Sequence, residues 1–230
     1  MTVRFRDASV TVDGTTILHP VNLDLSEQRI SIIGANGSGK STLIRMINGL
    51  TAATSGSVEV NGIPVGRRGR KVRGVVGFLF SDPDNQIIMP SVAEDVAFSL
   101  RGAGLTRDQV AERVTASLTM AGLTGKEEQS PHLLSGGEKQ MLALASITAL
   151  TPQVIVADEP SCLLDLVNRN QLRKTLGSLS QQVITVTHDL ELAADAERTI
   201  CVADGRVIDD GAPNEVIAAY VRRMSEASAP

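Results

Sequence analysis

The stretch GANGSGKST, residues 34–42, matches the pattern G-x-x-x-x-G-K-[ST] from Gly34 to Ser41. Before it, residues 30–33 form an apolar, largely β-branched run that predicts a buried strand. After it, apolar residues recur at helical spacing from Leu43 to Leu50. A strand, a glycine-rich loop and a helix in that order are the context in which this pattern marks a phosphate-binding loop.

The residue types of this loop suit a polyphosphate. Gly34, Gly37 and Gly39 lack a Cβ atom, so the backbone can curl and direct successive N–H groups at one point. That point lies at the N-terminus of the predicted helix, where unpaired amides and the helix dipole favour an anion. Lys40 is expected to reach the β- and γ-phosphates, and the Ser41 hydroxyl to ligate Mg²⁺. We therefore predict a nucleoside-triphosphate site, with ATP and Mg²⁺ bound by Gly34, Ala35, Asn36, Gly37, Ser38, Gly39, Lys40, Ser41 and Thr42.

Composition limits the class of protein. The 230 residues fit one large domain, and 42% hydrophobic with 21% charged residues is ordinary for a soluble globular protein. A net charge of −4 argues against nucleic acid as a partner. Cys162 and Cys201 lack the spacing of a zinc site or a disulfide framework. The most apolar run, residues 141–150, is much shorter than the ~20 residues that a membrane-spanning helix needs, so any membrane role is expected to come through a partner.

The remaining chain predicts an α/β fold. Short β-type runs at residues 3–5, 9–12 and 17–25, broken at Asp13-Gly14 and His19-Pro20, predict an antiparallel region, with further strands at 57–60 and 72–80. A basic cluster lies between and at the start of the strands predicted at 57–60 and 72–80, and it consists of Arg67, Arg68, Arg70, Lys71 and Arg73. It predicts a solvated hairpin, with contact to anionic lipid as the alternative.

Helical signals then replace the β-type runs. Ser91 with Glu94, and Thr106 with Gln109, are candidate capping boxes that predict a helical insert over residues 86–135. Strands and helices alternate after it, which predicts a mostly parallel sheet covered by helices. The expected elements are helices at 138–150, 165–179, 190–196 and from 213, and strands at 154–157, 183–187, 199–203 and 207–208. We predict one domain over 1–224, with a core at 1–85 and 136–224, a helical subdomain at 86–135 and a frayed tail at 225–230.

Two more stretches carry chemistry. The apolar run 154–157 leads into Asp158 and Glu159, which places two carboxylates at the carboxyl end of a predicted strand beside the phosphate loop. Asp158 is expected to hold Mg²⁺, and Glu159 to polarise the attacking water. The stretch LSGGEKQ, residues 134–140, begins with Ser135 and Glu138 at capping-box spacing. This box predicts a well-capped helix whose exposed glycine amides could also bind an anion.

Taken together, GANGSGKST, LSGGEKQ, VIVADEP and VTHD resemble the nucleotide-binding domain of ABC transporters. The resemblance covers residues 1 to about 220 and implies the P-loop NTPase fold and ATP hydrolysis. It implies that Glu159 is the catalytic base and that His188 senses the γ-phosphate. It also implies that Ser135, Gly136, Gly137 and Asp165 meet an ATP bound to a second chain, in a head-to-tail dimer formed with an identical chain or with a paralogue.

The stretch from Phe80 to Pro90 narrows this resemblance. Its Pro-Asp-x-Gln segment, residues 83–86, is similar to the ATPases of energy-coupling factor (ECF) importers of vitamins and metals, including cobalt and biotin systems. The implied partners are a coupling subunit and a substrate-binding subunit in the membrane, with this chain on the cytoplasmic face. Residues 87–89 would then either face the partner or pack in the core. Arg29-Ile30 and the short chain are most similar to the biotin-importer ATPases, with cobalt or nickel systems next.

The sequence departs from the family at two positions. Ser81 stands where most members carry a glutamine for metal and water contacts, and Gln86 is the candidate substitute. Val12 stands at the position where the family stacks an aromatic ring on adenine. Alternatives to an ECF subunit are the ATPase of a conventional importer and a soluble, non-transport ABC ATPase.

Overall fold

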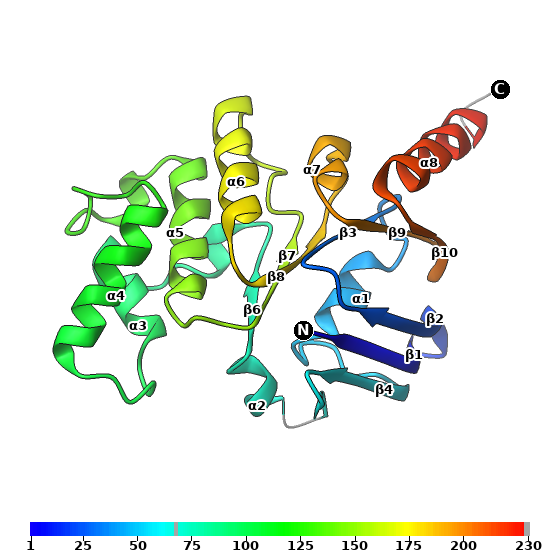
Figure 1. Cartoon of the computed structure of the whole chain (residues 1–230), viewed down its shortest axis with the longest axis horizontal. Coiled ribbons are helices and arrows are strands. Elements are labelled where there is room, and N and C mark those ends of the chain that lie inside the picture. The colour runs from blue at the N-terminus through cyan, green and yellow to red at the C-terminus, as the bar shows by residue number, and fades with distance from the viewer. Residues whose placement is uncertain (67–68, 228–230) are drawn as a thin grey trace.

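The computed structural model describes residues 1–66 and 69–227, arranged around two β-sheets (Figure 1). Within these ranges the larger sheet has six strands in the order β10-β9-β3-β8-β7-β6. All its strands but β10 run parallel. The strands are β3 (Arg29–Ile33), β6 (Val76–Leu79), β7 (Val154–Asp158), β8 (Gln182–Val186), β9 (Arg198–Ala203) and β10 (Arg206–Gly211). The predicted α/β architecture with a mostly parallel sheet is confirmed.

The smaller sheet is antiparallel and has the order β2-β1-β4-β5. Its strands are β1 (Val3–Val12), β2 (Thr15–Leu25), β4 (Ser55–Val60) and β5 (Ile63–Pro64). Asp13 and Gly14 join β1 to β2 with φ values of 48° and 76°, as the turn prediction requires. The predicted break at His19-Pro20 is wrong, because β2 continues through it. Pro20 is tolerated because β2 is the edge strand of its sheet and Pro20 is exposed.

Helix α1 (Lys40–Arg45) lies between the two sheets (Figure 1). Its buried residues Leu43 and Ile44 belong to the same apolar cluster as Phe5 of β1 and Ile32 of β3. This packing fixes the start of α1, and therefore the phosphate loop, against the carboxyl ends of the parallel strands.

A helical layer covers the opposite face of the parallel sheet (Figure 1). Ile155 of β7 and Val183 of β8 pack into it, whereas their neighbours Val154 and Ile184 face the cluster of α1. The alternation follows from the two-residue period of a strand. The layer consists of α3 (Val92–Ser99), α4 (Arg107–Met120), α5 (Gly136–Thr148) and α6 (Leu166–Ser178), with short 3₁₀ turns η1 (Pro83–Asn85) and η2 (Pro131–Leu133).

Two further helices cover the β9 end of the sheet. Helices α7 (Leu190–Ala194) and α8 (Pro213–Ala227) contribute Ala193 and Val216 to a small apolar cluster with Ile33 and Cys201. Across residues 1–66 and 69–227, the helices are all too short or too polar to cross a membrane.

The capping predictions are largely confirmed. Thr106 and Gln109 form a complete capping box at the start of α4. At α3 only half of the box is formed. Ser91 Oγ accepts a hydrogen bond from the Glu94 N–H at 3.3 Å, but the Glu94 carboxylate accepts one from the Ser91 hydroxyl and not from the Ser91 N–H.

The structure corrects three local predictions. The predicted hairpin of the basic cluster is wrong for its described part, because residues 70–73 form helix α2 (Arg70–Arg73), while Arg67 and Arg68 lie outside the described residues. Val72 is buried in the core and fixes this turn, so the strand predicted from residue 72 begins at Val76. The predicted tail is helical as far as Ala227 because α8 continues, and residues 228–230 lie outside the described residues.

Candidate functional site

The phosphate loop leaves β3 at the carboxyl edge of the parallel sheet. Gly34 has φ 147°, and a Cβ atom there would lie 2.1 Å from the Val202 carbonyl oxygen. Gly39, the N-cap of α1, has φ 101° and similarly approaches the Ile17 carbonyl. The positive φ favours glycine at both positions, and at Gly34 a Cβ atom would also clash with the backbone, whereas at Gly39 the contact of 3.1 Å is only tight. Gly37 also has a positive φ but faces open space.

The side chain of Lys40 is buried and reaches back to the start of the phosphate loop. Its buried ammonium donates hydrogen bonds to the carbonyl oxygens of Gly34 at 2.8 Å and Ala35 at 2.7 Å. Burial lowers the pKa of Lys40, and the charges of Glu159 and Asp158 oppose that shift. The lysine is thus held at the loop by acceptors that an anionic ligand could replace.

Asp158 ends β7 as a buried carboxylate beside the loop. Its Oδ1 accepts from the Ser41 hydroxyl at 2.9 Å, and its Oδ2 from the Arg45 guanidinium at 3.2 Å. Sequence reasoning missed Arg45, whose only signal was its place one helical turn after Ser41.

The Ser41–Asp158 pair fits Mg²⁺. In the described part of the chain, His, Cys, Asp and Glu form no group of three or more that could hold a metal. Mg²⁺ in nucleotide sites is held by one or two protein oxygens together with phosphate oxygens. A hydroxyl and a carboxylate already within 2.9 Å of each other provide two such oxygens.

Glu159 and His188, predicted from separate motifs, are in contact. Glu159 Oε2 lies 2.8 Å from His188 Nδ1 and accepts the His188 backbone N–H at 3.1 Å. The backbone of Glu159 adopts φ 49°, and its N–H donates to the Val186 carbonyl oxygen at 2.9 Å. The ends of β7 and β8 are thereby joined next to the phosphate loop. We call residues 34–42 with Asp158, Glu159 and His188 the sheet-edge site.

Ser135 caps α5 in a complete capping box. Its Oγ accepts from the Glu138 N–H at 3.3 Å, and the Glu138 carboxylate accepts the Ser135 N–H at 2.8 Å. A hydrogen bond from Lys126 is the largest cause of a lowered pKa at Glu138, which keeps this carboxylate charged in its capping role. Gly136 faces open space, whereas a Cβ on Gly137 would lie 2.2 Å from the Asn168 side chain.

The approach of Gly137 to Asn168 brings the starts of α5 and α6 together. Asp165 caps α6 by accepting the Asn168 N–H at 2.8 Å. Four large apolar side chains around these two caps are more than half exposed: Leu133 72%, Leu163 68%, Leu166 61% and Val167 75%. We call these four residues with Ser135, Gly136, Gly137 and Asp165 the α5/α6 surface. Within the described residues, no hydrogen bond joins this surface to the phosphate loop.

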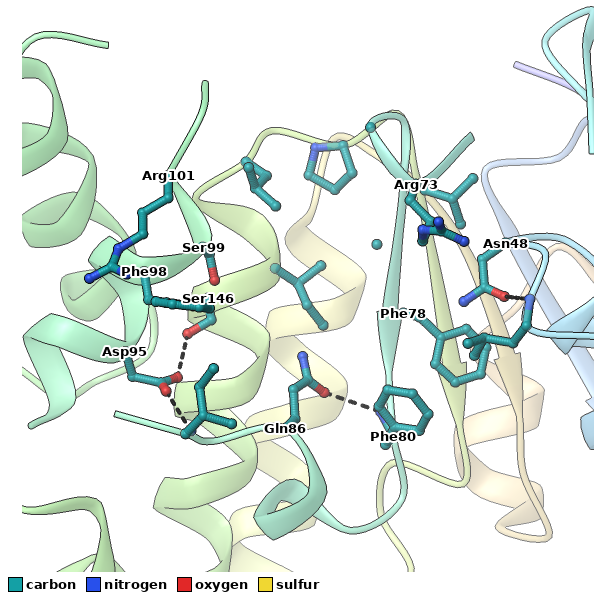
Figure 2. Close-up of a pocket in the computed structure, with 18 residues that line it drawn as sticks. Asn48, Arg73, Phe78, Phe80, Gln86, Asp95, Phe98, Ser99, Arg101 and Ser146 are labelled. Atoms are coloured by element: carbon teal, nitrogen blue, oxygen red, sulfur yellow. Dashed lines mark hydrogen bonds between the residues drawn. The ribbon is translucent and has the colours of Figure 1, made fainter. Parts of the chain in front are cut away.

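Gln86 lies elsewhere, in the wall of a cavity of about 780 Å³ between β6, α3 and α5 (Figure 2). Its Oε1 accepts from the Phe80 N–H at 3.5 Å. Neither Ser41 nor Asp158 lines this cavity. The assignment of Gln86 to the metal therefore stays a prediction.

Residues 87–89 differ in burial, and a partner-facing role for them stays a prediction. Ile87 packs against the core of the helical layer, whereas Ile88 is 63% exposed at the cavity. Met89 is half-buried.

Comparison with known proteins identifies the family. The sequence model of the family described as ABC transporter matches residues 18–162 of this chain. This range includes the phosphate loop, Ser135 and the Asp158–Glu159 pair. The chain belongs to the ABC transporter family of ATP-binding proteins. It is accordingly an ATP-hydrolysing cassette.

Two relatives are ATP-binding proteins of named transporters. The biotin transport ATP-binding protein BioM of Rhizobium etli is 40% identical, over 96% of this chain and 98% of the relative. The energy-coupling factor transporter ATP-binding protein EcfA of Methanothermobacter thermautotrophicus is 39% identical, over 97% of this chain and 75% of the relative.

Two solved structures share the fold closely. CbiO1 of Clostridium perfringens, described as part of the ABC transporter complex cbiONQ, has a TM-score of 0.86 and 30% identity, covering 99% of this chain and 95% of its own. A dimeric post-hydrolysis state of the ATP-binding cassette MJ0796, bound to ADP and Pi, has a TM-score of 0.80 and 29% identity, covering 92% of this chain and 98% of its own.

Proposed function

We propose that the chain is the energy-coupling ATPase of an ECF-type importer for a vitamin or a metal ion. Biotin is the favoured cargo, and cobalt or nickel is next. The similarity to EcfA and BioM and to a component of a cbiONQ complex supports this assignment. In this role the chain works at the cytoplasmic face of the membrane, bound to an integral coupling subunit and a substrate-binding subunit.

The observation that carries the proposal is the separation of two anion-binding features within one chain. The sheet-edge site offers loop amides and Lys40, while the α5/α6 surface offers the capped start of a helix surrounded by exposed leucine and valine side chains. Clustered exposed apolar residues mark a surface that a partner covers. A second copy, or a paralogue, placed head to tail would bring its own α5/α6 surface onto this chain's bound ATP. The dimeric cassette with ADP and Pi supports the formation of a dimer.

In this dimer each group has a distinct role. Lys40 and the loop amides bind the β- and γ-phosphates, and Lys40 exchanges its bonds to Gly34 and Ala35 for phosphate oxygens. Mg²⁺, held by Ser41 and Asp158, would neutralise phosphate charge. The Glu159 carboxylate accepts a proton from the attacking water, and His188 orients that carboxylate. The partner's capped helix stabilises the developing charge through its N-terminal amides.

Complementation between inactive variants tests the shared site. Lys40→Met and Ser135→Arg should each hydrolyse ATP poorly, because each disables both sites of its own dimer. A one-to-one mixture should recover up to about a quarter of the normal rate, since half the dimers then hold one intact site of two. A mixture of Lys40→Met with Glu159→Gln is the matched control and should recover nothing, because both lesions lie in the sheet-edge site. Equal recovery in the two mixtures would disprove the shared site.

The transport assignment has a separate test. Affinity purification of the tagged chain from its own membranes in mild detergent should recover integral membrane proteins at fixed stoichiometry, identifiable by mass spectrometry. Recovery of the chain alone in the soluble fraction would favour a non-transport ABC ATPase.

A further inference from the structure

Asp95 is a buried carboxylate at the point where the cavity wall meets the helical layer. It lies on α3 and is 4% exposed. Its Oδ1 accepts the backbone N–H groups of Ile88 at 2.9 Å and Met89 at 3.2 Å. Its Oδ2 accepts the Ser146 hydroxyl of α5 at 3.0 Å (Figure 2). One side chain therefore joins a loop that lines the cavity to the helix that Ser135 caps.

Two more bonds join the same loop to the same helix. Gln140 Nε2 donates to the Phe80 carbonyl oxygen at 3.1 Å, and Lys139 Nζ lies 2.7 Å from Asp84 Oδ1. The loop from Phe80 to Met89 is thus held to α5 at its beginning, middle and end. The Asp95–Ser146 bond is buried, and the bonds to Ile88, Met89 and Phe80 are partly buried. Asp84 is exposed, so its pair with Lys139 contributes less because solvent screens it.

The two ends of this connection serve different parts of the protein. Ile88 and Gln86 line the cavity, whereas Ser135 belongs to the α5/α6 surface. Ser146 lies eleven residues after Ser135, which is roughly 16 Å along the helix axis. A helix of that length transmits a displacement at one end to the other because its backbone is rigid.

We propose that Asp95 is a positioning residue that makes the cavity loop and α5 move as one body. A displacement of the loop then moves Ser135 relative to the ATP of the facing chain. Asp95 does this without touching nucleotide. The rigid connection follows from the contacts of this chain alone. Only the statement that a membrane partner displaces the loop rests on the proposed function.

A purely local role is the competing explanation. Asp95 satisfies two loop N–H groups, and a buried N–H without an acceptor is costly, so Asp95→Ala would disturb the loop in either case. Ser146→Ala separates the two explanations. It removes the bond to α5 and leaves both loop N–H groups bonded to Asp95.

Native-state hydrogen exchange at low denaturant provides the first measurement on the full chain. In the parent protein, the Ile88 and Met89 amides should open with the same free energy and denaturant dependence as the interior amides of α5. In Ser146→Ala, the two loop amides should exchange about 2- to 30-fold faster relative to those of α5. Asp95→Asn, which retains an acceptor for the loop and a donor for Ser146, should largely preserve the shared opening.

Thr148→Ala is the matched control. It removes a hydroxyl from the same helix, and among the described residues that hydroxyl donates to the Leu144 and Ala145 carbonyl oxygens of α5 itself. It should leave the relative exchange unchanged. The proposal is overturned if the loop and α5 already open independently in the parent, or if Ser146→Ala behaves like Thr148→Ala.

The second measurement uses the chain in complex with its co-purified membrane proteins. Ser146→Ala should keep the KM for ATP while losing about 2- to 30-fold of the stimulation of kcat by those proteins. If the exchange result holds and no membrane protein co-purifies, the proposed function fails and the positioning role stands. If stimulation is unchanged in Ser146→Ala although membrane proteins are bound, the coupling role of Asp95 is wrong.

Discussion

The sheet-edge site and the α5/α6 surface differ in how completely this chain supports them. At the sheet edge, Lys40, Ser41, Asp158 and Glu159 all have partners within the chain, and glycines fit against strand carbonyls. At the α5/α6 surface, Ser135 and Asp165 only cap their own helices, and the apolar residues around them face solvent. The first region thus has the groups to hold a ligand within one chain, whereas the second exposes apolar side chains, as a surface suited to contact with another protein does.

Removing the base should produce the largest effect. Glu159→Gln keeps an oxygen for the His188 N–H but cannot accept a proton, so turnover should fall by about 10²- to 10⁴-fold. ATP binding should remain, because Lys40 and the loop amides are unchanged. Phosphate release from the purified complex and equilibrium nucleotide binding are the measurements. Unchanged phosphate release would remove Glu159 from this role.

The second-largest expected effect is the loss of folding stability when a glycine of the phosphate loop is replaced. Gly34→Ala places a Cβ atom 2.1 Å from the Val202 carbonyl oxygen, so it should lower the free energy of unfolding by about 3 kcal/mol or more and abolish ATP binding. Gly37→Ala has no such contact and should cost only about 1 kcal/mol, for its positive φ. Thermal and denaturant unfolding measure both. Equal losses would show that conformation, and not packing against β9, sets the requirement.

Two serine caps sharpen the comparison between regions. Ser135→Ala and Ser91→Ala each remove an N-cap, so each should cost roughly 1 kcal/mol of stability. Only Ser135→Ala should also slow ATP hydrolysis, because only Ser135 belongs to the α5/α6 surface. Denaturant unfolding and steady-state ATPase rates, measured on the same preparations, test this. Parallel losses of activity in both variants would reduce Ser135 to a structural cap.

The smallest expected effect concerns recognition of the adenine ring of ATP. Val12, at the exposed end of β1, cannot stack on adenine as an aromatic ring does, and such stacking contributes about 1–3 kcal/mol. ATP and GTP should therefore bind with similar affinity. Competition binding to the Glu159→Gln variant measures the ratio, and a strong preference for ATP would contradict this expectation.

Local sequence patterns predicted much of the fold because hydrophobic period and capping act over a few residues. The structure has the buried strands predicted at 30–33 and 154–157, as Arg29–Ile33 and Val154–Asp158. It also has the predicted capping box at Thr106. The errors arose where a long-range contact decides. Val72 reaches the core where residues 70–73 form a helix, and an edge position lets β2 continue through Pro20.

The candidate site was predicted residue by residue, but its connections were not. The motifs identified Glu159 and His188, while their contact comes from the parallel pairing of β7 with β8. The sequence assigned no contact to Arg45 or Asp95, and each bonds a residue far away in the sequence. Gln86, placed by resemblance, lies in the cavity wall, and its role toward the metal stays a prediction.

The sequence by itself determined the chemistry, because a glycine loop, a lysine, two acids after an apolar strand and a capped serine are set by residue type and short spacing. Only the tertiary structure decided which of these groups meet. Pairing of strands distant in the chain brings Asp158 to Ser41 and Glu159 to His188, while packing in the helical layer places Ser135 apart from them and ties its helix to the cavity through Asp95. Such pairings depend on the order of strands and on side-chain fit across the core, which no local pattern encodes.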